Sequence, residues 1–278
     1  MSEEQRLTGG NVSAVYKKGE HVFRSQKENS KNVQRLLRHL EAKQLPGVPR
    51  FVGIDEQHRE ILTFLPGETA DYPLKAYMWH DDVLDDVARL MRQYHDATVD
   101  FETDDWEPLI NTPTPYEVVC HNDFAVYNTI FQDQRLSGVI DFDLAAPGPR
   151  AWDIVYALYT FVPLSRRRQA PDGSVIDYVS EQDDVRFSER VSRFLDAYGY
   201  EGSRAELLPM LLLRVEALYL LIDQRAADGD AAFIRMKEEG HDTHYRAEHR
   251  FITEHGQKWF IDKTLKKYNT QYYIYNCL

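Results

Sequence analysis

The stretch His121-Asn122-Asp123-Phe124-Ala125-Val126-Tyr127-Asn128, together with Val139-Ile140-Asp141-Phe142-Asp143, decides the fold. It reads His-x-Asp-x4-Asn, followed by an apolar strand that ends in a second aspartate. Transfer of a phosphoryl group from a nucleotide needs a carboxylate that orients and deprotonates the acceptor hydroxyl, and Asp123 suits that role. Asn128 and Asp141 supply hard oxygen ligands for Mg²⁺, which leave most of the coordination shell to phosphates and water. The pattern therefore predicts a phosphotransfer site.

Other interpretations of these residues are weaker. Asp123 and Asn128 could serve only turn hydrogen bonds, but two metal-ligand positions fall where the chemistry needs them. Asp141 and Asp143 also match the Asp-x-Asp of metal-dependent glycosyltransferases, although no doubly wound nucleotide-sugar domain precedes them. Histidines gather near the C-terminal end at positions 241, 244, 249 and 255. The charged residues between these histidines favour a solvated helix face over a zinc site.

The composition of the chain argues against several classes of protein. The 278 residues include 33 Lys and Arg against 45 Asp and Glu, a formal net charge of −12, which argues against nucleic acid as a partner. The most apolar stretch, 207–222, carries a proline, an arginine and a glutamate, so no membrane span is expected. Two cysteines and a polar start, Met1-Ser2-Glu3-Glu4-Gln5-Arg6, predict a protein of a reducing, cytoplasmic compartment.

The pattern of apolar residues predicts an α+β protein with strands first and helices later. β-prone runs at 12–17 and 21–24, and again at 50–54 and 60–64, predict two hairpins. Helical spacing is found at 30–43 and 83–94, and the apolar stretch 207–222 predicts a central buried helix. We expect Leu65-Pro66-Gly67 to link two lobes, 1–66 and 67–278. The tyrosine-rich end, 266–278, fits none of these elements.

The segment resembles the catalytic core of the aminoglycoside phosphotransferase and choline kinase-like superfamily, which shares the bilobal protein-kinase-like fold. Trp152-Asp153 resembles the Trp-Asp pair that follows the metal loop in that family. The hairpin from Gly9-Gly10-Asn11-Val12 to Arg24 resembles its nucleotide-covering hairpin, and Arg89–His95 the helix before its catalytic loop. The resemblance covers most of the chain and implies a small β-rich lobe followed by a larger, mainly helical lobe.

The resemblance implies a role for each matching residue. Asp123 would be the catalytic base, and Asn128 and Asp141 would hold Mg²⁺ against ATP or GTP. His121 would brace the catalytic loop, and Asp153 would anchor its backbone. Asp-Phe-Asp at 141–143 replaces the Asp-Phe-Gly of protein kinases, and the segment from there to Asp153 is too short to dock a peptide. A small-molecule acceptor is therefore expected.

The sequence departs from the family pattern at the basic residue that binds the nucleotide phosphates. Where protein kinases have a strand lysine, Arg24 ends the second strand of the hairpin, and Lys17 and Lys27 stay open as alternatives. Arginine keeps the charge and can bind phosphate with two nitrogens. The helix at 30–43 offers no obvious glutamate partner, only Gln34 near the expected turn and Glu41 near its end. The Gly-x-Gly-x-x-Gly loop is also absent.

The expected function is phosphorylation of a hydroxyl on a small cationic molecule, with an aminoglycoside-like antibiotic first and choline or another amino alcohol or sugar second. Candidate acceptor carboxylates are Glu238, Glu239 and Asp242, with Asp183 or Asp184 as further candidates. The alternative is a catalytically silent binding or immunity protein that kept the fold. The protein is expected to act as a monomer or homodimer, without a nucleic acid or membrane partner.

Overall fold

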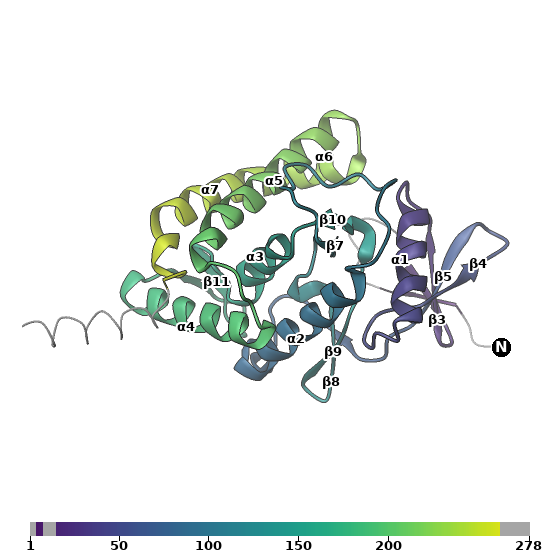
Figure 1. The fold of residues 1–278 in the computed structure, drawn as a ribbon, viewed down its shortest axis with the longest axis horizontal. Coiled ribbons are helices and arrows are strands. Elements are labelled where there is room, and N and C mark those ends of the chain that lie inside the picture. Colours follow the sequence, from purple (N-terminus) through teal and green to yellow (C-terminus); the bar gives the residue numbers. More distant parts are fainter. Residues whose placement is uncertain (1–3, 8–14, 262–278) are drawn as a thin grey trace, which may run out of the picture.

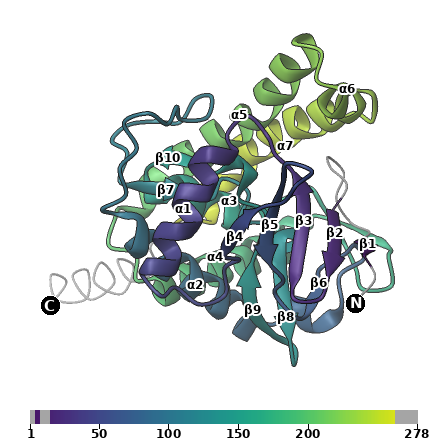
Figure 2. The same cartoon turned by 90° about the vertical axis from the view of Figure 1, so that its right-hand side faces the viewer.

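Residues 4–7 and 15–261 are described by a computed structural model. The first part is a five-stranded antiparallel sheet in the order β1-β2-β3-β5-β4, seen beside α1 in Figure 2. Its strands are β1 (Gln5–Leu7), β2 (Val15–Lys18), β3 (His21–Ser25), β4 (Phe51–Ile54) and β5 (Arg59–Thr63). Both predicted hairpins are confirmed, while the segment Gly9-Gly10-Asn11-Val12 lies outside the described residues.

Helix α1 (Ser30–Ala42) crosses between the sheet and the rest of the molecule. The apolar residues predicted to share one face, Val33, Leu36, Leu37 and Leu40, are all buried. They join Phe51 of β4 in one core. The periodicity of the sequence therefore gave both the helix and its buried face correctly.

The second part is mainly helical and forms the left side of Figure 1. Its helices are α2 (Asp81–Thr98), α3 (Arg150–Phe161), α4 (Ser180–Tyr198), α5 (Leu207–Ala227), α6 (Ala231–Glu238) and α7 (His241–His255). α5 lies against both α3 and α7. The sequence predicted a central buried helix at 207–222, and α5 buries residues around most of its circumference, while Leu212, Leu213 and Leu220 remain partly exposed. None of the helices in the described part is apolar over a length that would cross a membrane.

Short strands link the helices. β6 (Glu68–Thr69), β8 (Thr129–Gln132) and β9 (Arg135–Val139) form one small sheet, and β7 (Val118–Cys120) pairs with β10 (Ala146–Gly148). A further hairpin of β11 (Arg167–Gln169) and β12 (Val175–Asp177) was not predicted. Its strands are three residues each, β11 is Arg-Arg-Gln and β12 is Val-Ile-Asp, and neither is long enough to show an alternation of apolar and polar residues.

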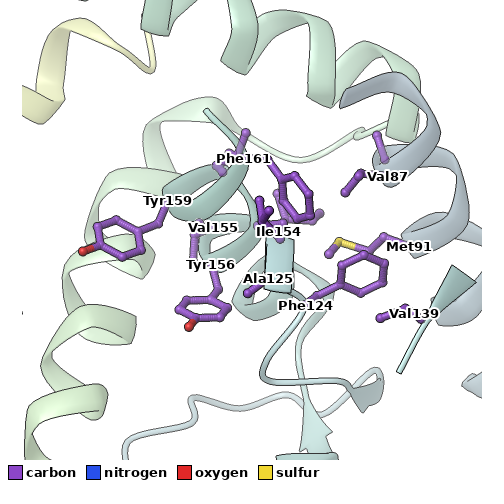
Figure 3. Packing of buried hydrophobic residues seen from close by; sticks show 14 of the residues in the cluster. Val87, Met91, Phe124, Ala125, Val139, Ile154, Val155, Tyr156, Tyr159 and Phe161 are labelled. Atoms are coloured by element: carbon purple, nitrogen blue, oxygen red, sulfur yellow. The ribbon is translucent and has the colours of Figure 1, made fainter. Parts of the chain in front are cut away.

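The core of the helical part surrounds α3. Figure 3 shows Ile154 near Phe124 of the loop after β7 and Met91 of α2, whereas Tyr156 and Tyr159 project from the opposite side of α3. Asp153 is also fully buried on this helix, so α3 has almost no solvent-facing side. The expected α+β class is confirmed, and the lobe boundary near Pro66 stays a prediction.

The two parts touch through backbone at one tight contact. The carbonyl oxygen of Gly47, in the loop before β4, accepts a hydrogen bond of 2.8 Å from the amide of Val139 in β9. A Cβ atom at Gly138 would lie 2.5 Å from that same oxygen. Because backbone on both sides fixes the separation, Gly138 has no room for a side chain.

Gly138→Ala is therefore expected to destabilise the protein by about 1–3 kcal/mol, the usual cost of overpacking. For a chain of this size, this corresponds to a fall of roughly 2–10 °C in melting temperature. Gly53→Ala in β4 is the matched control, because a Cβ there meets nothing within 4 Å. Thermal unfolding followed by circular dichroism compares the two, and equal melting temperatures would show that the contact is loose.

Candidate active site

The catalytic loop begins where β7 ends and is anchored from beneath by Asp153. The Asp153 Oδ2 atom accepts a hydrogen bond of 2.6 Å from the amide of His121, and its Oδ1 atom one of 2.8 Å from the amide of Asn122. His95 of α2 adds a third contact, Nε2 to Oδ2 at 3.2 Å. Burial alone would raise the pKa of Asp153, but the hydrogen bond and charge of His95 hold it below its ordinary value. The carboxylate thus stays ionised and fixes two consecutive amides.

His121 itself is fully buried behind the loop. Its Nε2 atom lies 3.1 Å from the carbonyl oxygen of Ile140, and its Nδ1 atom accepts the amide of Asp123 at 3.3 Å. Burial lowers the pKa of His121, so the ring is neutral and carries its proton on Nε2. The ring therefore connects the loop at 121–128 to the strand that leads to Asp141, and its role as a brace stays a prediction.

Asn128 and Asp141 lie at the same end of the β8–β9 hairpin. Asn128 directly precedes β8, Asp141 follows β9 by two residues, and the amide of Ile140 donates to the carbonyl of Asn128 at 2.8 Å. The Asn128 Nδ2 atom donates to Asp123 Oδ2 at 2.8 Å, which leaves the amide oxygen for other partners. Asp123, Asn128 and Asp141 are thus gathered into one site by a single hairpin.

Asp141 lies beside a second carboxylate, that of Asp143. Its backbone is left-handed (φ 65°), and its side chain is 48% exposed. Burial and the neighbouring Asp143 carboxylate raise the pKa of Asp141 to about 6, although Arg24 and Lys27 act in the opposite direction. Two adjacent carboxylates beside an amide oxygen are the donors that a hard divalent cation prefers, so the residues present fit Mg²⁺.

Arg24 lies in the site and has a glutamate partner that sequence reasoning missed. Its Nε atom binds Glu60 Oε2 at 2.9 Å, and its Nη1 atom lies 2.7 Å from Asp143 and 3.7 Å from Asp141. Glu60 is on β5, directly opposite Arg24 of β3. Gln34 of α1 completes the group by donating to Glu60 Oε1 at 2.7 Å. The partner thus comes from the next strand, and the helix contributes an amide.

Lys27 also reaches the site, whereas Lys17 does not. The Lys27 ammonium group binds the second oxygen of Asp143, so that carboxylate holds two cations. Lys17 instead lies over the ring of Phe64, 3.7 Å from its centroid. Of the three basic candidates, Arg24 and Lys27 are therefore close to the metal-ligand candidates.

The candidate acceptor carboxylates are not gathered around Asp123. Glu238 and Glu239 are exposed at the end of α6, and Asp242 is partly exposed in the first turn of α7. Asp183 and Asp184 are engaged elsewhere: Asp183 accepts the amide of Val179 at 2.8 Å and pairs with Arg168, and Asp184 binds Lys258 and Trp259. These two carboxylates stabilise the N-terminal end of α4 and connect it to the last described turn.

Tyrosines surround Asp123 instead. The hydroxyl of Tyr127 donates to Asp123 Oδ1 at 2.7 Å, and that of Tyr156 lies 3.2 Å from the same oxygen. Arg214 of α5 lies over the Tyr156 ring, 4.4 Å from its centroid, and binds the carbonyl of Asn122. Sequence reasoning missed Tyr156 and Arg214 because they come from helices far along the chain. Tyr127, within the catalytic motif itself, was visible but was given no role.

Part of the chain matches a known protein family. Residues 97–186, which include the catalytic loop and Asp153, match the model of the phosphotransferase enzyme family. The trifolitoxin immunity protein of Rhizobium leguminosarum bv. trifolii is 30% identical over 206 residues, which cover 72% of this chain and 75% of that protein.

Solved structures share the fold over most of the chain. The choline kinase of Cryptosporidium parvum superposes with a TM-score of 0.60 at 14% identity, covering 94% of this chain and 93% of that one. The gentamicin–APH(2'')-IIa complex gives a TM-score of 0.58 at 19% identity, covering 85% and 90%. The expected bilobal, protein-kinase-like fold is confirmed. From its family match and its 30% identical relative, the chain belongs to the phosphotransferase enzyme family.

Proposed function

We propose that the protein transfers the γ-phosphoryl group of ATP or GTP, with Mg²⁺, to a hydroxyl of a small cationic molecule. The observation that carries this proposal is the convergence of Asp123, Asn128 and Asp141 on one hairpin end, above a loop anchored by Asp153. Asp123 would orient the acceptor hydroxyl and take its proton. Asn128 and Asp141 would hold Mg²⁺, which neutralises charge on the phosphates.

Arg24 is the proposed phosphate grip, with Lys27 beside it. Glu60 holds the Arg24 guanidinium through Nε, which leaves Nη1 directed at the aspartates of the metal site. A nucleotide phosphate bound beside the metal would compete for the same nitrogen. Among nucleotides, both ATP and GTP fit this part of the proposal, since it involves only the phosphates.

A cationic acceptor is supported by the charge of the molecule and by α7. The formal net charge of −12 favours positively charged ligands. Asp242 precedes Tyr245 by three residues on α7, so the two share a face, and Tyr245 interacts electrostatically with Asp123. Asp242 is therefore the best placed of the three carboxylates, with Glu238 and Glu239 at its N-terminal side. An aminoglycoside-like antibiotic, then choline or another amino alcohol or sugar, are the acceptors to test.

A second candidate function is a catalytically silent immunity protein. It is favoured by the name of one relative, the trifolitoxin immunity protein. The intact set of Asp123, Asn128 and Asp141 favours the kinase. Nucleotide binding and phosphoryl transfer separate the two functions.

The kinase proposal is tested by incubating the protein with ATP or GTP, Mg²⁺ and panels of aminoglycosides, amino alcohols and sugars, and recording phosphoryl mass gain. Asp123→Asn keeps the shape of the side chain and removes the proton acceptor, so turnover of the best acceptor should fall by about two orders of magnitude or more. Asp104→Asn, on an exposed turn, is the control. A rate for Asp123→Asn within a few-fold of the parent would contradict the assignment of the base.

Metal and nucleotide should stabilise the protein only together. At a nucleotide concentration about 100 times the dissociation constant, linkage predicts about 2.7 kcal/mol, or roughly 5–10 °C in melting temperature. Asp141→Ala should lose the Mg²⁺-dependent part of this shift, whereas Asp104→Ala should keep it. An unchanged shift in Asp141→Ala would remove that residue from the metal site, and no shift in the parent would favour the silent binder.

The raised pKa of Asp141 predicts a pH-dependent stability in the absence of metal. The folded state holds the Asp141 proton up to about pH 6, while the unfolded chain releases it near its ordinary value of 3.8. The free energy of unfolding therefore falls as the pH rises from 3.8 to about 6, and Asp141→Asn, which has no charge to bury, should restore it. Because the side chain is half exposed, solvent screening limits the gain to about 1 kcal/mol, or roughly 2–4 °C at pH 7.5. Melting in EDTA at pH 4.5, near the start of this range, should show only about a third of that gain, and a gain of equal size at both pH values would refute the prediction.

A further inference from the structure

Two phenol groups and one amide surround the carboxylate of Asp123. Tyr127 and Tyr156 both approach Oδ1, at 2.7 and 3.2 Å, and Asn128 donates to Oδ2 at 2.8 Å. The two phenol oxygens are themselves 3.1 Å apart. A carboxylate oxygen accepts about two hydrogen bonds, so these contacts fill the Oδ1 atom. An acceptor hydroxyl that is to give its proton to Oδ1 must displace one of the phenols.

The two tyrosines differ in how firmly they are held. Tyr156 is 3% exposed on α3, with Arg214 over one side of its ring and Tyr159 stacked near it at 6.3 Å between centroids. Tyr127 belongs to the turn before β8, and the residue is 41% exposed although its hydroxyl lies between Asp123 and Tyr156. Exposure lets the Tyr127 ring rotate outward at low cost, whereas Tyr156 cannot leave without opening the core.

Tyr127 and Tyr156 also differ in the hydrogen bonds that their hydroxyl groups can donate. Burial raises the pKa of Tyr127 well above its usual range, with Tyr156 and Asp123 adding to the effect, so its hydroxyl remains a donor at neutral pH. Each phenol carries one hydrogen, and Tyr156 can direct its own either to Asp123 or to the Tyr127 oxygen. Removal of Tyr127 would leave Tyr156 as a single donor on Oδ1 and free the second position.

We propose that the Tyr127 hydroxyl occupies the acceptor's place on Asp123 until an acceptor arrives, and that it thereby keeps water from being activated there. Tyr156 is the fixed positioning residue that keeps the carboxylate oriented when Tyr127 moves. This inference rests on the proposed kinase function, and it concerns how the site discriminates between the acceptor and water.

The reaction that Tyr127 suppresses is nucleotide hydrolysis. A water oxygen forms a bond to the γ-phosphorus, and the bond from that phosphorus to the β–γ bridging oxygen breaks. The bridging oxygen leaves with the bonding electrons as part of ADP, and the water proton passes to Asp123. Only ATP, Mg²⁺ and water are required, so the test does not depend on knowing the acceptor.

The experiment measures acceptor-free release of phosphate from ATP with Mg²⁺ by the full-length parent, Tyr127→Phe and Tyr156→Phe. Tyr116→Phe and Tyr159→Phe serve as controls: Tyr116 matches Tyr127 in exposure at 44%, and Tyr159 follows Tyr156 on the same helix. Loss of one hydrogen bond to a charged group should raise hydrolysis by Tyr127→Phe about ten- to a hundredfold. Tyr156→Phe should not exceed the parent, because the carboxylate loses its fixed donor. Melting temperatures with and without ATP and Mg²⁺ verify folding and nucleotide binding in each variant.

Opposite effects of the two tyrosine variants would support the inference, because a merely structural role would lower both rates. Hydrolysis by Tyr127→Phe at or below the parent rate, with its ATP-dependent melting shift intact, would overturn it while leaving the kinase proposal standing. A fivefold rise in either control would also overturn it, since the effect would not be specific to Oδ1. A parent that shows no ATP-dependent shift would refute the proposed function, and this inference with it.

Discussion

The buried carboxylate of Asp153 is the interaction on which the rest of the site depends. It is completely enclosed, and it binds the consecutive amides of His121 and Asn122. Directly after these amides the chain turns at a left-handed residue, Asn122 (φ 64°), a conformation that asparagine tolerates better than most residues. Removal of one partner from such a buried charge typically costs about 3–5 kcal/mol, so the loop and α3 hold each other in place.

A short chain of hydrogen bonds connects Asp153 to the other residues of the site. His121 links the catalytic loop to Ile140, and Ile140 in turn binds the backbone of Asn128. Asp123 is therefore two hydrogen bonds from Asp153, Asp141 follows Ile140 at the same remove, and Asn128 is three hydrogen bonds away. A site built in this way depends little on the loops around it, which fits a family whose members act on chemically different acceptors.

The sequence contained the local parts of this arrangement and lacked the distant ones. The motif at 121–128 and the strand before Asp141 could be predicted from the sequence, because their residues are close together along the chain and the chemistry fixes their spacing. Glu60 was not predicted as the partner of Arg24, because the family pattern places a glutamate on the helix at 30–43. Strand pairing instead places Glu60 opposite Arg24. Tyr156 and Arg214 reach Asp123 only through the packing of α3 against α5, which no spacing rule anticipates.

Asp143 changes the charge interactions of the basic and acidic residues around it. Glycine at this position would bring no charge, whereas Asp143 holds both Arg24 and Lys27 and raises the pKa of Asp141. The carboxylate thus draws two cations from the sheet lobe toward the metal-ligand residues of the helical lobe. Its cost is the repulsion with Asp141, which a divalent cation would relieve. Because relief of that repulsion and binding of phosphate by Arg24 both depend on the same carboxylate, metal and nucleotide are expected to bind cooperatively in this protein.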